Sequence, residues 1–269
     1  MEEIPLEEDF YRFLRANKKL AGTTSINLIT RLPKGWMDWR EDELHEFYFE
    51  ILDSNRHSSS SKHSAHYAIK YLCEFKGYKF DYKPPKVHHK RRQSIEPEDV
   101  WKILEVIDND RDLALILTHL YTGLRPTEIL ALKKEDLDLD KGTIIIKNTK
   151  TYQDRIVPIH KKPMMALRKY IAKRNDDCPS LFYSIREKTP MTMYAYRFAL
   201  KKYSKKAGIR KVTPYQLRHT FATQFIENGG DVLILKSIMG HSNIKTTEGY
   251  VHENTRMIMK GYEKACPEF

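Results

Sequence analysis

A short basic segment that contains two prolines divides the chain and limits what it can fold into. Residues 83–92 hold two adjacent prolines and five Lys or Arg side chains, with no carboxylate among them. Adjacent prolines favour an extended backbone and like charges repel, so this segment is unsuited to a hydrophobic core. The sequence therefore predicts a first domain at residues 1–82, a linker at residues 83–93 and a second domain at residues 94–269.

Residues 1–82 show the periodicity of short amphipathic helices. Three groups of apolar residues each fall on one face of a helix, which predicts a small all-helical bundle. The serine run at residues 58–61 lies between the second and third groups and predicts a loop. The three faces are Leu6, Phe10, Phe13 and Leu14; Leu44, Phe47, Tyr48, Ile51 and Leu52; and Tyr67, Ala68, Tyr71, Leu72 and Phe75.

Residues 94–269 are also mostly helical, with one β interruption. A β-rich run at residues 143–146 is followed, after a polar turn, by a second run at residues 155–159, RIVPI. Two such runs predict a hairpin, which places Lys150 at its tip. The expected fold class is mainly α, of the α+β kind: a helical bundle joined to a mostly helical domain with a small antiparallel β-hairpin sheet.

The composition favours a polyanionic partner. The chain carries 47 Lys and Arg against 36 Asp and Glu, a net charge of +11, which indicates such a partner without naming it. Three scattered cysteines are too few for a disulfide framework or a zinc cluster, which favours a reducing compartment. The acidic start and the lack of a long apolar run predict a cytoplasmic protein with no membrane segment.

The stretch Thr213–Thr223, TPYQLRHTFAT, predicts the start of a helix. Thr213 suits the N-cap, Pro214 suits the first helical position, and Gln216 completes a capping box. Arg218 then lies in the first two turns beside an apolar stripe. An arginine there favours an anion, but pairing with a structural carboxylate fits this segment alone at least as well. The stripe consists of Leu217, Phe221 and Phe225.

A second arginine lies at a predicted helix junction. Gly123 ends one helix and Pro126 begins the next, so Arg125 is held between them. A planar guanidinium fixed in this way can bind two phosphate oxygens. Glu128, one turn later, is placed to orient Arg125. A surface arginine after a helix-ending glycine is also common, so this segment leaves both interpretations open.

The stretch Ile238–His252 holds the last candidate residues. A short helix capped by Asp231 ends at Gly240, His241 follows it directly, and Tyr250 comes nine residues after His241. By itself, Tyr250 fits an ordinary surface residue better than a nucleophile.

Together these segments resemble the tyrosine recombinase, or phage integrase, family over about residues 94–260. The family's TGLRxxE segment matches Arg125 and Glu128, and its hairpin lysine ahead of an RxVP strand matches Lys150. Its LRHTFAT helix matches Arg218, and its GH pair followed nine residues later by tyrosine matches His241 and Tyr250. The resemblance implies that Arg125, Lys150, Arg218, His241 and Tyr250 form the catalytic set, with Glu128 in support.

One position departs from the family pattern. Tyr215 stands where the family usually has a histidine three residues before the second arginine. A tyrosine with a pKa near 10 is a poor base at neutral pH, whereas a histidine near 6.5 is a good one. Tyr215 can still donate a hydrogen bond to a phosphate oxygen or to the nucleophile. His219 is expected to be structural support, and Lys147 is a weaker alternative to Lys150.

Two basic segments are candidate DNA contacts. The linker supplies Lys90, Arg91 and Arg92. Residues 194–211 carry seven basic side chains, no acidic one and several aromatic ones, and resemble the family's groove-facing helix. The contacts expected there are Arg197, Lys201 and Lys202, with a solvated basic face as the alternative. The resemblance also implies double-stranded DNA as partner, bound as a homotetramer on two sites, and a free protein that is a monomer or weak dimer.

The resemblance implies a site-specific recombinase that cleaves and rejoins DNA through a 3′-phosphotyrosine, in a mobile element or a resolution system. A phenol serves as nucleophile and later as leaving group, and this chemistry requires no cofactor and no metal. Three alternatives remain: an enzyme like type IB topoisomerases, which shares the intermediate; a DNA-binding protein that has lost catalysis, as Tyr215 would suggest; and a metal-dependent nuclease, for which no HExxH-like ligand set is present.

Overall fold

The chain folds into two compact units, residues 1–91 and 92–269. The computed structural model describes residues 6–87, 94–147, 154–184, 188–240, 259 and 261–267. The linker residues Lys90, Arg91 and Arg92 lie outside the described residues, as do Lys150, His241 and Tyr250.

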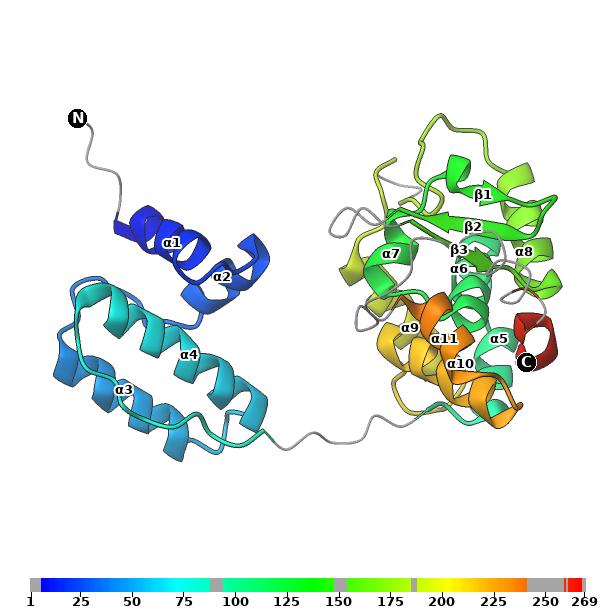
Figure 1. Ribbon diagram of the computed structural model, residues 1–269. Helices are drawn as coiled ribbons and strands as arrows, with labels where there is room; N and C mark the ends of the chain where they lie inside the picture. The colour runs from blue at the N-terminus through cyan, green and yellow to red at the C-terminus, as the bar shows by residue number, and fades with distance from the viewer. Residues whose placement is uncertain are drawn as a thin grey trace. The chain divides into compact units, whose positions relative to one another are not determined.

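The first unit is a helical bundle, as predicted (Figure 1). Its helices are α1 (Leu6–Ala16), α2 (Gly22–Ile29), α3 (Glu41–Asp53) and α4 (Ser59–Lys76). The described side chains of the predicted apolar faces pack into one core, and seven of them are buried. The residues of these faces that are fully or almost fully buried are Phe10, Leu14, Leu44, Tyr48, Ile51, Ala68 and Leu72.

The prediction of a loop at the serine run is wrong, because most of this run belongs to α4. Ser58 is the N-cap, and its side-chain oxygen accepts a hydrogen bond from the backbone N–H of Ser61 at 3.2 Å. The first amides of a helix have no partner within the helix, and a serine hydroxyl supplies one. A serine cluster can therefore start a helix as well as form a loop.

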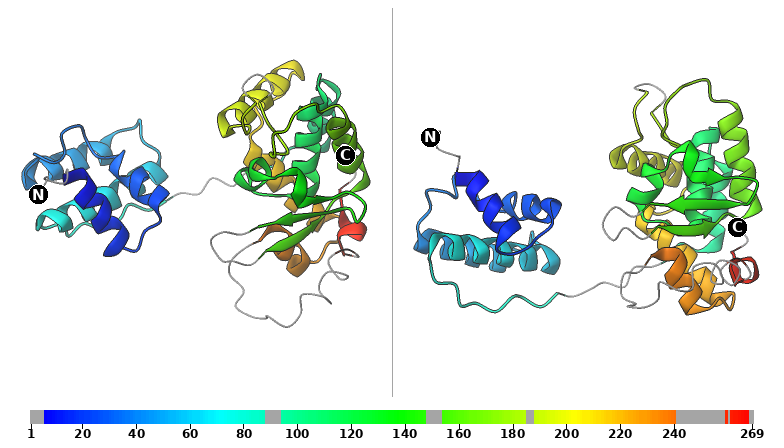
Figure 2. Two further views of the ribbon diagram at one scale, coloured as in Figure 1. Left: turned by 90° about the horizontal axis from the view of Figure 1, so that it is seen from above. Right: turned by 45° about the horizontal axis from the view of Figure 1, so that its top comes forward.

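The second unit is mostly helical with a small antiparallel sheet, which confirms the expected fold class (Figures 1 and 2). The strands are β1 (Leu137–Asp138), β2 (Thr143–Ile146) and β3 (Arg155–Pro158), in the order β1-β2-β3. The helices are α5 (Pro97–Glu105), α6 (Asp110–Thr122), α7 (Pro126–Ala131), α8 (Lys161–Ala172), α9 (Met193–Lys206), α10 (Pro214–Glu227) and α11 (Val232–Met239), with a 3-10 turn at Lys134–Asp136.

The hairpin of β2 and β3 lies where the sequence predicts it. Ile144 pairs with Val157 and both are fully buried, whereas the neighbouring pair, Ile145 and Ile156, faces outward. This alternation is the one expected of a sheet with one face on the core. Edge strand β3 packs beside α11, and the buried helix α6 packs against α8 and α10. These contacts bring the ends of α6, α11 and β3 together.

The last described residues pack onto the same unit. Tyr262 is buried, its hydroxyl donates to the carbonyl of Tyr121 at 2.6 Å, and it accepts from the backbone N–H of His160 at 3.2 Å. This end of the chain is therefore fixed to α6 and to the start of α8. Across the described ranges, no helix has the length and apolar character needed to span a lipid bilayer.

Candidate active site

Arg125 lies at the junction between α6 and α7. Gly123 ends α6 with a positive φ of 58°, and Arg125 is the N-cap of α7, which starts at Pro126. The Glu128 carboxylate accepts from the Arg125 backbone N–H at 2.7 Å and from its guanidinium at 2.8 Å. Backbone and side chain of Arg125 are therefore held by the same carboxylate, as the spacing in the sequence suggests.

Arg218 lies in the second turn of α10, and its side chain is buried against the same junction. Only 7% of the residue is exposed. Its guanidinium donates to the carbonyl of Gly123 at 2.5 Å and to that of Met239 at 3.1 Å. Burial, and then the nearby charge of Arg125, lower the pKa of Arg218 to about 10. Arg218 therefore stays positively charged at neutral pH in a site that disfavours its charge, which is a favourable setting for a bound anion.

The two arginines face one cavity. It has a volume of about 550 Å³ and lies between α7, α10 and α11. Besides the arginines it contains a further basic residue, Lys236, for which no role was predicted. The lining consists of Arg125, Tyr215, Arg218, His219, Ala222, Val232, Leu235, Lys236 and Met239. Two guanidinium groups from distant parts of the chain can thus contact one anionic group here.

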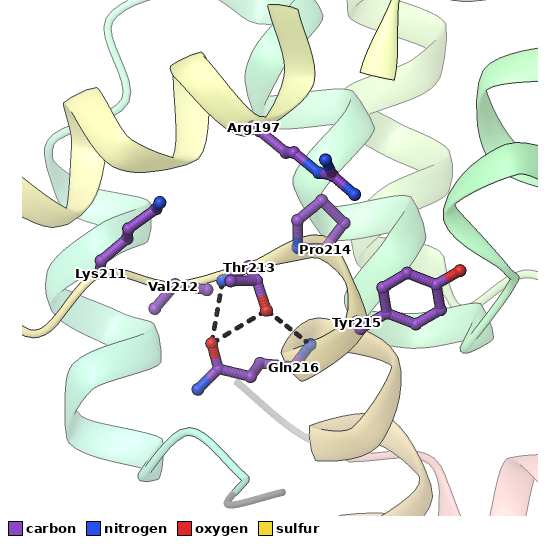
Figure 3. A pocket seen from close by; sticks show the side chains of 7 residues that line it. All are labelled: Arg197, Lys211, Val212, Thr213, Pro214, Tyr215 and Gln216. Atoms are coloured by element: carbon purple, nitrogen blue, oxygen red, sulfur yellow. Dashed lines mark hydrogen bonds between the residues drawn. The ribbon is translucent and has the colours of Figure 1, made fainter. Parts of the chain in front are cut away.

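Tyr215 lies at the rim of this cavity and also lines a second one. It projects from the first turn of α10 and is 43% exposed. The second cavity, of about 520 Å³, is also lined by Arg197 and Lys211 (Figure 3). The capping box at the start of α10 is present as predicted: Gln216 N–H donates to the Thr213 hydroxyl, and the Gln216 side chain accepts from Thr213 N–H at 3.0 Å. A candidate catalytic residue and a candidate DNA contact therefore border one continuous surface.

A third arginine, Arg155, binds the same Glu128 carboxylate from strand β3. Arg155 opens β3 and donates to both oxygens of Glu128, at 2.8 and 3.1 Å. Burial favours protonation of Glu128, but hydrogen bonds from Arg155 and Arg125 outweigh it and lower the pKa of Glu128. Glu128 is therefore an ionised acceptor shared by two arginines.

Three of the predicted catalytic residues, Lys150, His241 and Tyr250, lie outside the described residues. Gly240, which precedes His241 in the sequence, accepts a hydrogen bond from the Arg125 guanidinium at 2.6 Å through its carbonyl. Ile146 pairs with Arg155 in the hairpin, and Lys150 falls between these two in the sequence. Gly240 thus contacts Arg125, and the two strands between which Lys150 falls in the sequence meet at the pair of Ile146 and Arg155.

The alternative lysine, Lys147, is engaged elsewhere. Its ammonium group pairs with Asp136 at 2.9 Å and with Glu135 at 3.3 Å. Hydrogen bonds to Asp136, and then to Glu135, raise the pKa of Lys147. A lysine held in its charged form is a poorer proton donor. His219, which the sequence favours as structural support, lines the cavity instead of packing away from it.

The basic helix α9 presents its charges in two groups. Lys202 and Lys206 both pair with Asp108, at 3.0 and 2.6 Å. Arg197 and Lys201 are exposed, and Phe198 lines a shallow groove together with Lys201, Lys202, Lys205 and Lys206. Of the expected contacts on α9, Lys202 already has an acidic partner. In the described part of the chain, no cluster of three or more His, Cys, Asp or Glu side chains is arranged to hold a metal ion.

Comparison with known proteins places this chain in a family. Residues 93–257 match the phage integrase family, and the chain belongs to that family. Tyrosine recombinase XerA of Thermococcus kodakarensis is 32% identical over 268 residues, which cover 96% of this chain and 94% of that protein. Tyrosine recombinase XerA of Pyrococcus horikoshii is 36% identical over 188 residues, covering 68% of this chain and 65% of that protein. The chain is thus a tyrosine recombinase, an enzyme that cleaves and rejoins DNA.

Solved structures show the same fold. A crystal structure of XerA recombinase matches with a TM-score of 0.54 and 25% identity over 98% of both chains. The Tn1549 transposon integrase in complex with a circular intermediate DNA matches with a TM-score of 0.68 and 19% identity, over 95% of this chain and 98% of that chain. A λ integrase dimer bound to a COC′ core site matches with a TM-score of 0.67 and 14% identity, over 90% and 97%.

Proposed function

We propose that this protein recombines two DNA sites through a covalent 3′-phosphotyrosine formed by Tyr250. The observation that carries the proposal is the cavity shared by Arg125 and Arg218, whose partners include the carbonyls of Met239 and Gly240 just before His241. Two fixed guanidinium groups can neutralise the two non-bridging oxygens of one phosphodiester. The motif that contains His241 and Tyr250 follows directly in the sequence.

Each chemical step uses a group of this chain. The Tyr250 phenol oxygen attacks phosphorus, the bond from phosphorus to the 5′ oxygen breaks, and the 3′ phosphate remains on Tyr250. Lys150 gives a proton to the leaving 5′ oxygen, and His241 donates a hydrogen bond to a non-bridging oxygen. In the return step a 5′-hydroxyl of the second DNA attacks phosphorus and gives its proton to Lys150. Tyr250 then leaves and takes from water the proton that it gave to water in the first step. The phosphodiester energy is kept in the covalent bond, so no external energy source is needed.

Tyr215 acts in this proposal as a hydrogen-bond donor and not as a base. It lies at the cavity rim with much of its side chain exposed, within the same lining as both arginines. A tyrosine hydroxyl has a proton to donate and is a poor base. Its acceptor is a phosphate oxygen or the Tyr250 oxygen.

The proposed assembly is a homotetramer on two double-stranded DNA sites, formed from free monomers or weak dimers. Residues 1–82 would be the core-binding domain, residues 83–93 the linker and residues 94–269 the catalytic domain. Phosphate contacts would come from Lys90, Arg91, Arg92, Arg197, Lys201 and Lys202. The matched λ integrase structure is a dimer on a core site, and another match is XerH bound to its difH substrate, which supports a DNA-borne assembly of this kind. The biological setting would be a mobile element or a resolution system.

Strand joining between two labelled duplexes tests this function. Fragments from the DNA flanking the gene are prepared as duplexes with two different labels and incubated in pairs with the protein. We expect recombinant products that join the two labels, and none with Tyr250→Phe. Relaxation of supercoiled DNA without joining of two sites would instead favour the topoisomerase-like alternative. Tight binding without strand breakage at the true site would favour a DNA-binding protein.

A further inference from the structure

Arg155 is mostly enclosed by protein beside the active site, and it does not line the cavity. Its side chain is 14% exposed. The guanidinium donates to Glu128 through both terminal nitrogens, and its Nε donates to the carbonyl of Ile238 at 2.9 Å. All three of its nitrogens are therefore used inside the protein. Any effect of Arg155 on a bound phosphate has to pass through Glu128 or through α11.

The charges around Glu128 explain why two arginines bind it. Glu128 alone would neutralise Arg125, and a phosphate in the cavity would then meet little net charge from this pair. Arg155 adds a second positive charge on the far side of the same carboxylate, so the three groups together carry one net positive charge. The side chains of Glu128 and Arg155 are only 18% and 14% exposed, so their charges are screened less than surface charges and the difference is felt at the phosphate.

The end of α11 provides a second, independent observation. The carbonyls of Ile238, Met239 and Gly240 accept from Arg155, Arg218 and Arg125, in that order. These carbonyls are at the negative end of the helix, where positive groups are favoured. Three arginines thus donate hydrogen bonds to three successive carbonyls at the end of α11.

The backbone conformation and the surroundings of Gly240 favour glycine at this position. It has a positive φ of 65°, and a Cβ added there would lie 2.9 Å from the Arg155 guanidinium carbon. Arg155 is therefore packed directly against the residue that precedes His241.

We propose that Arg155 is a positioning residue for DNA cleavage: it balances the charge of Glu128 so that Arg125 remains available to the scissile phosphate, and it anchors the end of α11. This inference rests on the proposed function, because it assigns Arg155 to the same site. The sequence motif only marks Arg155 as the first residue of a strand; its partners lie in distant segments.

Replacement of Arg155 is tested on DNA cleavage and DNA binding separately. Nicked duplexes that give a covalent adduct with the wild-type protein serve as substrates. We expect Arg155→Gln to lower the rate constant of adduct formation about 100-fold, the size of effect seen when one preorganised donor is lost. The dissociation constant for DNA should rise by no more than about 10-fold, because only the phosphate in this cavity feels the charge of Glu128 while the other DNA contacts are unchanged. Arg155→Lys keeps the charge but not the paired hydrogen bonds, so its rate constant of adduct formation should lie between those of the wild type and Arg155→Gln.

Arg168 supplies the matched control. It belongs to the same unit and forms an ion pair with Asp140 at 2.9 Å. Both side chains of this pair are exposed, unlike those of Arg155 and Glu128. Arg168→Gln removes an arginine and an ion pair, and it should cleave DNA at the wild-type rate. Circular dichroism and thermal unfolding of every variant show whether it is folded.

Two further measurements separate charge balance from a merely structural role. Adding Glu128→Gln to Arg155→Gln removes the uncompensated carboxylate, so the double variant should cleave at least about 10-fold faster than Arg155→Gln alone. A methylphosphonate at the scissile position removes the phosphate charge. With it, the gap between wild type and Arg155→Gln should shrink to about 3-fold or less.

The proposal is overturned if Arg155→Gln cleaves at the wild-type rate, or if its loss is unchanged by both Glu128→Gln and the methylphosphonate. A wild-type protein that forms no adduct on any fragment would instead count against the proposed function. Inorganic phosphate then decides the inference without a target site. Arg155→Gln should bind it about 10-fold more weakly than wild type, and Glu128→Gln should restore the affinity; equal affinities in all three proteins would overturn it.

Discussion

Gly123 ends α6 at the point where α10 crosses it, and replacing it with alanine tests how this junction is built. Its φ is +58°, and an added Cβ would lie 2.3 Å from Cδ1 of the Phe221 ring. The Gly123 carbonyl also accepts from Arg218. Gly123→Ala should therefore disturb both the core and the candidate active site.

The magnitude follows from two separate effects. A non-glycine residue in the left-handed region costs about 1–2 kcal/mol. Overpacking against a buried ring adds about 1–3 kcal/mol. The free energy of unfolding should therefore fall by about 2–5 kcal/mol, which for a unit of this size lowers Tm by roughly 4–20 °C.

Gly208→Ala is the matched control for this measurement. Gly208 has a similar positive φ of 67°, but an added Cβ there would meet nothing within 4 Å. Gly208→Ala should show the backbone effect alone, about 1–2 kcal/mol. Thermal or urea unfolding of both variants gives the comparison. If Gly123→Ala is no less stable than Gly208→Ala, the account of the close contact with Phe221 is refuted.

Three further predictions concern single groups of the site and its surroundings. Tyr215→Phe should slow adduct formation about 10-fold. Tyr215→His should keep activity and add a pH dependence near 6.5 to the rate profile. Equal rates for the wild type and Tyr215→Phe would exclude a donor role. Lys150→Ala should lower the cleavage rate about 100-fold or more, and Lys147→Ala should have little effect because Lys147 is paired with Asp136; the reverse order would exchange their roles. Burial lowers the pKa of His119 to about 3. The folded protein thus keeps this imidazole neutral while the unfolded chain binds a proton below about pH 6.5, so stability is lost as pH falls from about 6.5 toward 3. Between pH 7 and pH 5 this amounts to about 2 kcal/mol, and unfolding measurements on His119→Gln should lack that part of the pH dependence.

Features set by neighbours in the sequence were predictable. The capping box at Thr213, the hairpin of β2 and β3 and the junction that holds Arg125 each depend on a few adjacent residues, and each is present. The loop expected at the serine run failed because a serine hydroxyl serves a helix start as readily as a loop. Strand β1 was not predicted, because its two residues are too short to show a period.

Contacts between distant segments were not predictable from the sequence. The contacts of Arg155 and the position of Lys236 in the cavity depend on where α11 lies relative to β3 and α10, and no local pattern records this. A resemblance to a family identifies which arginines act, but not which carbonyls and carboxylates hold them. The pairing of Lys202 with Asp108 is of the same kind, since the partners lie 94 residues apart.

The most direct test of the central claim is mass spectrometry of the peptide linked to DNA after covalent trapping on nicked duplexes. The account predicts one linked peptide with the DNA 3′ phosphate on Tyr250. No adduct should form with Tyr250→Phe, and adduct formation should be strongly slowed by Arg218→Ala. An adduct on another residue, or one that persists in Tyr250→Phe, would contradict it.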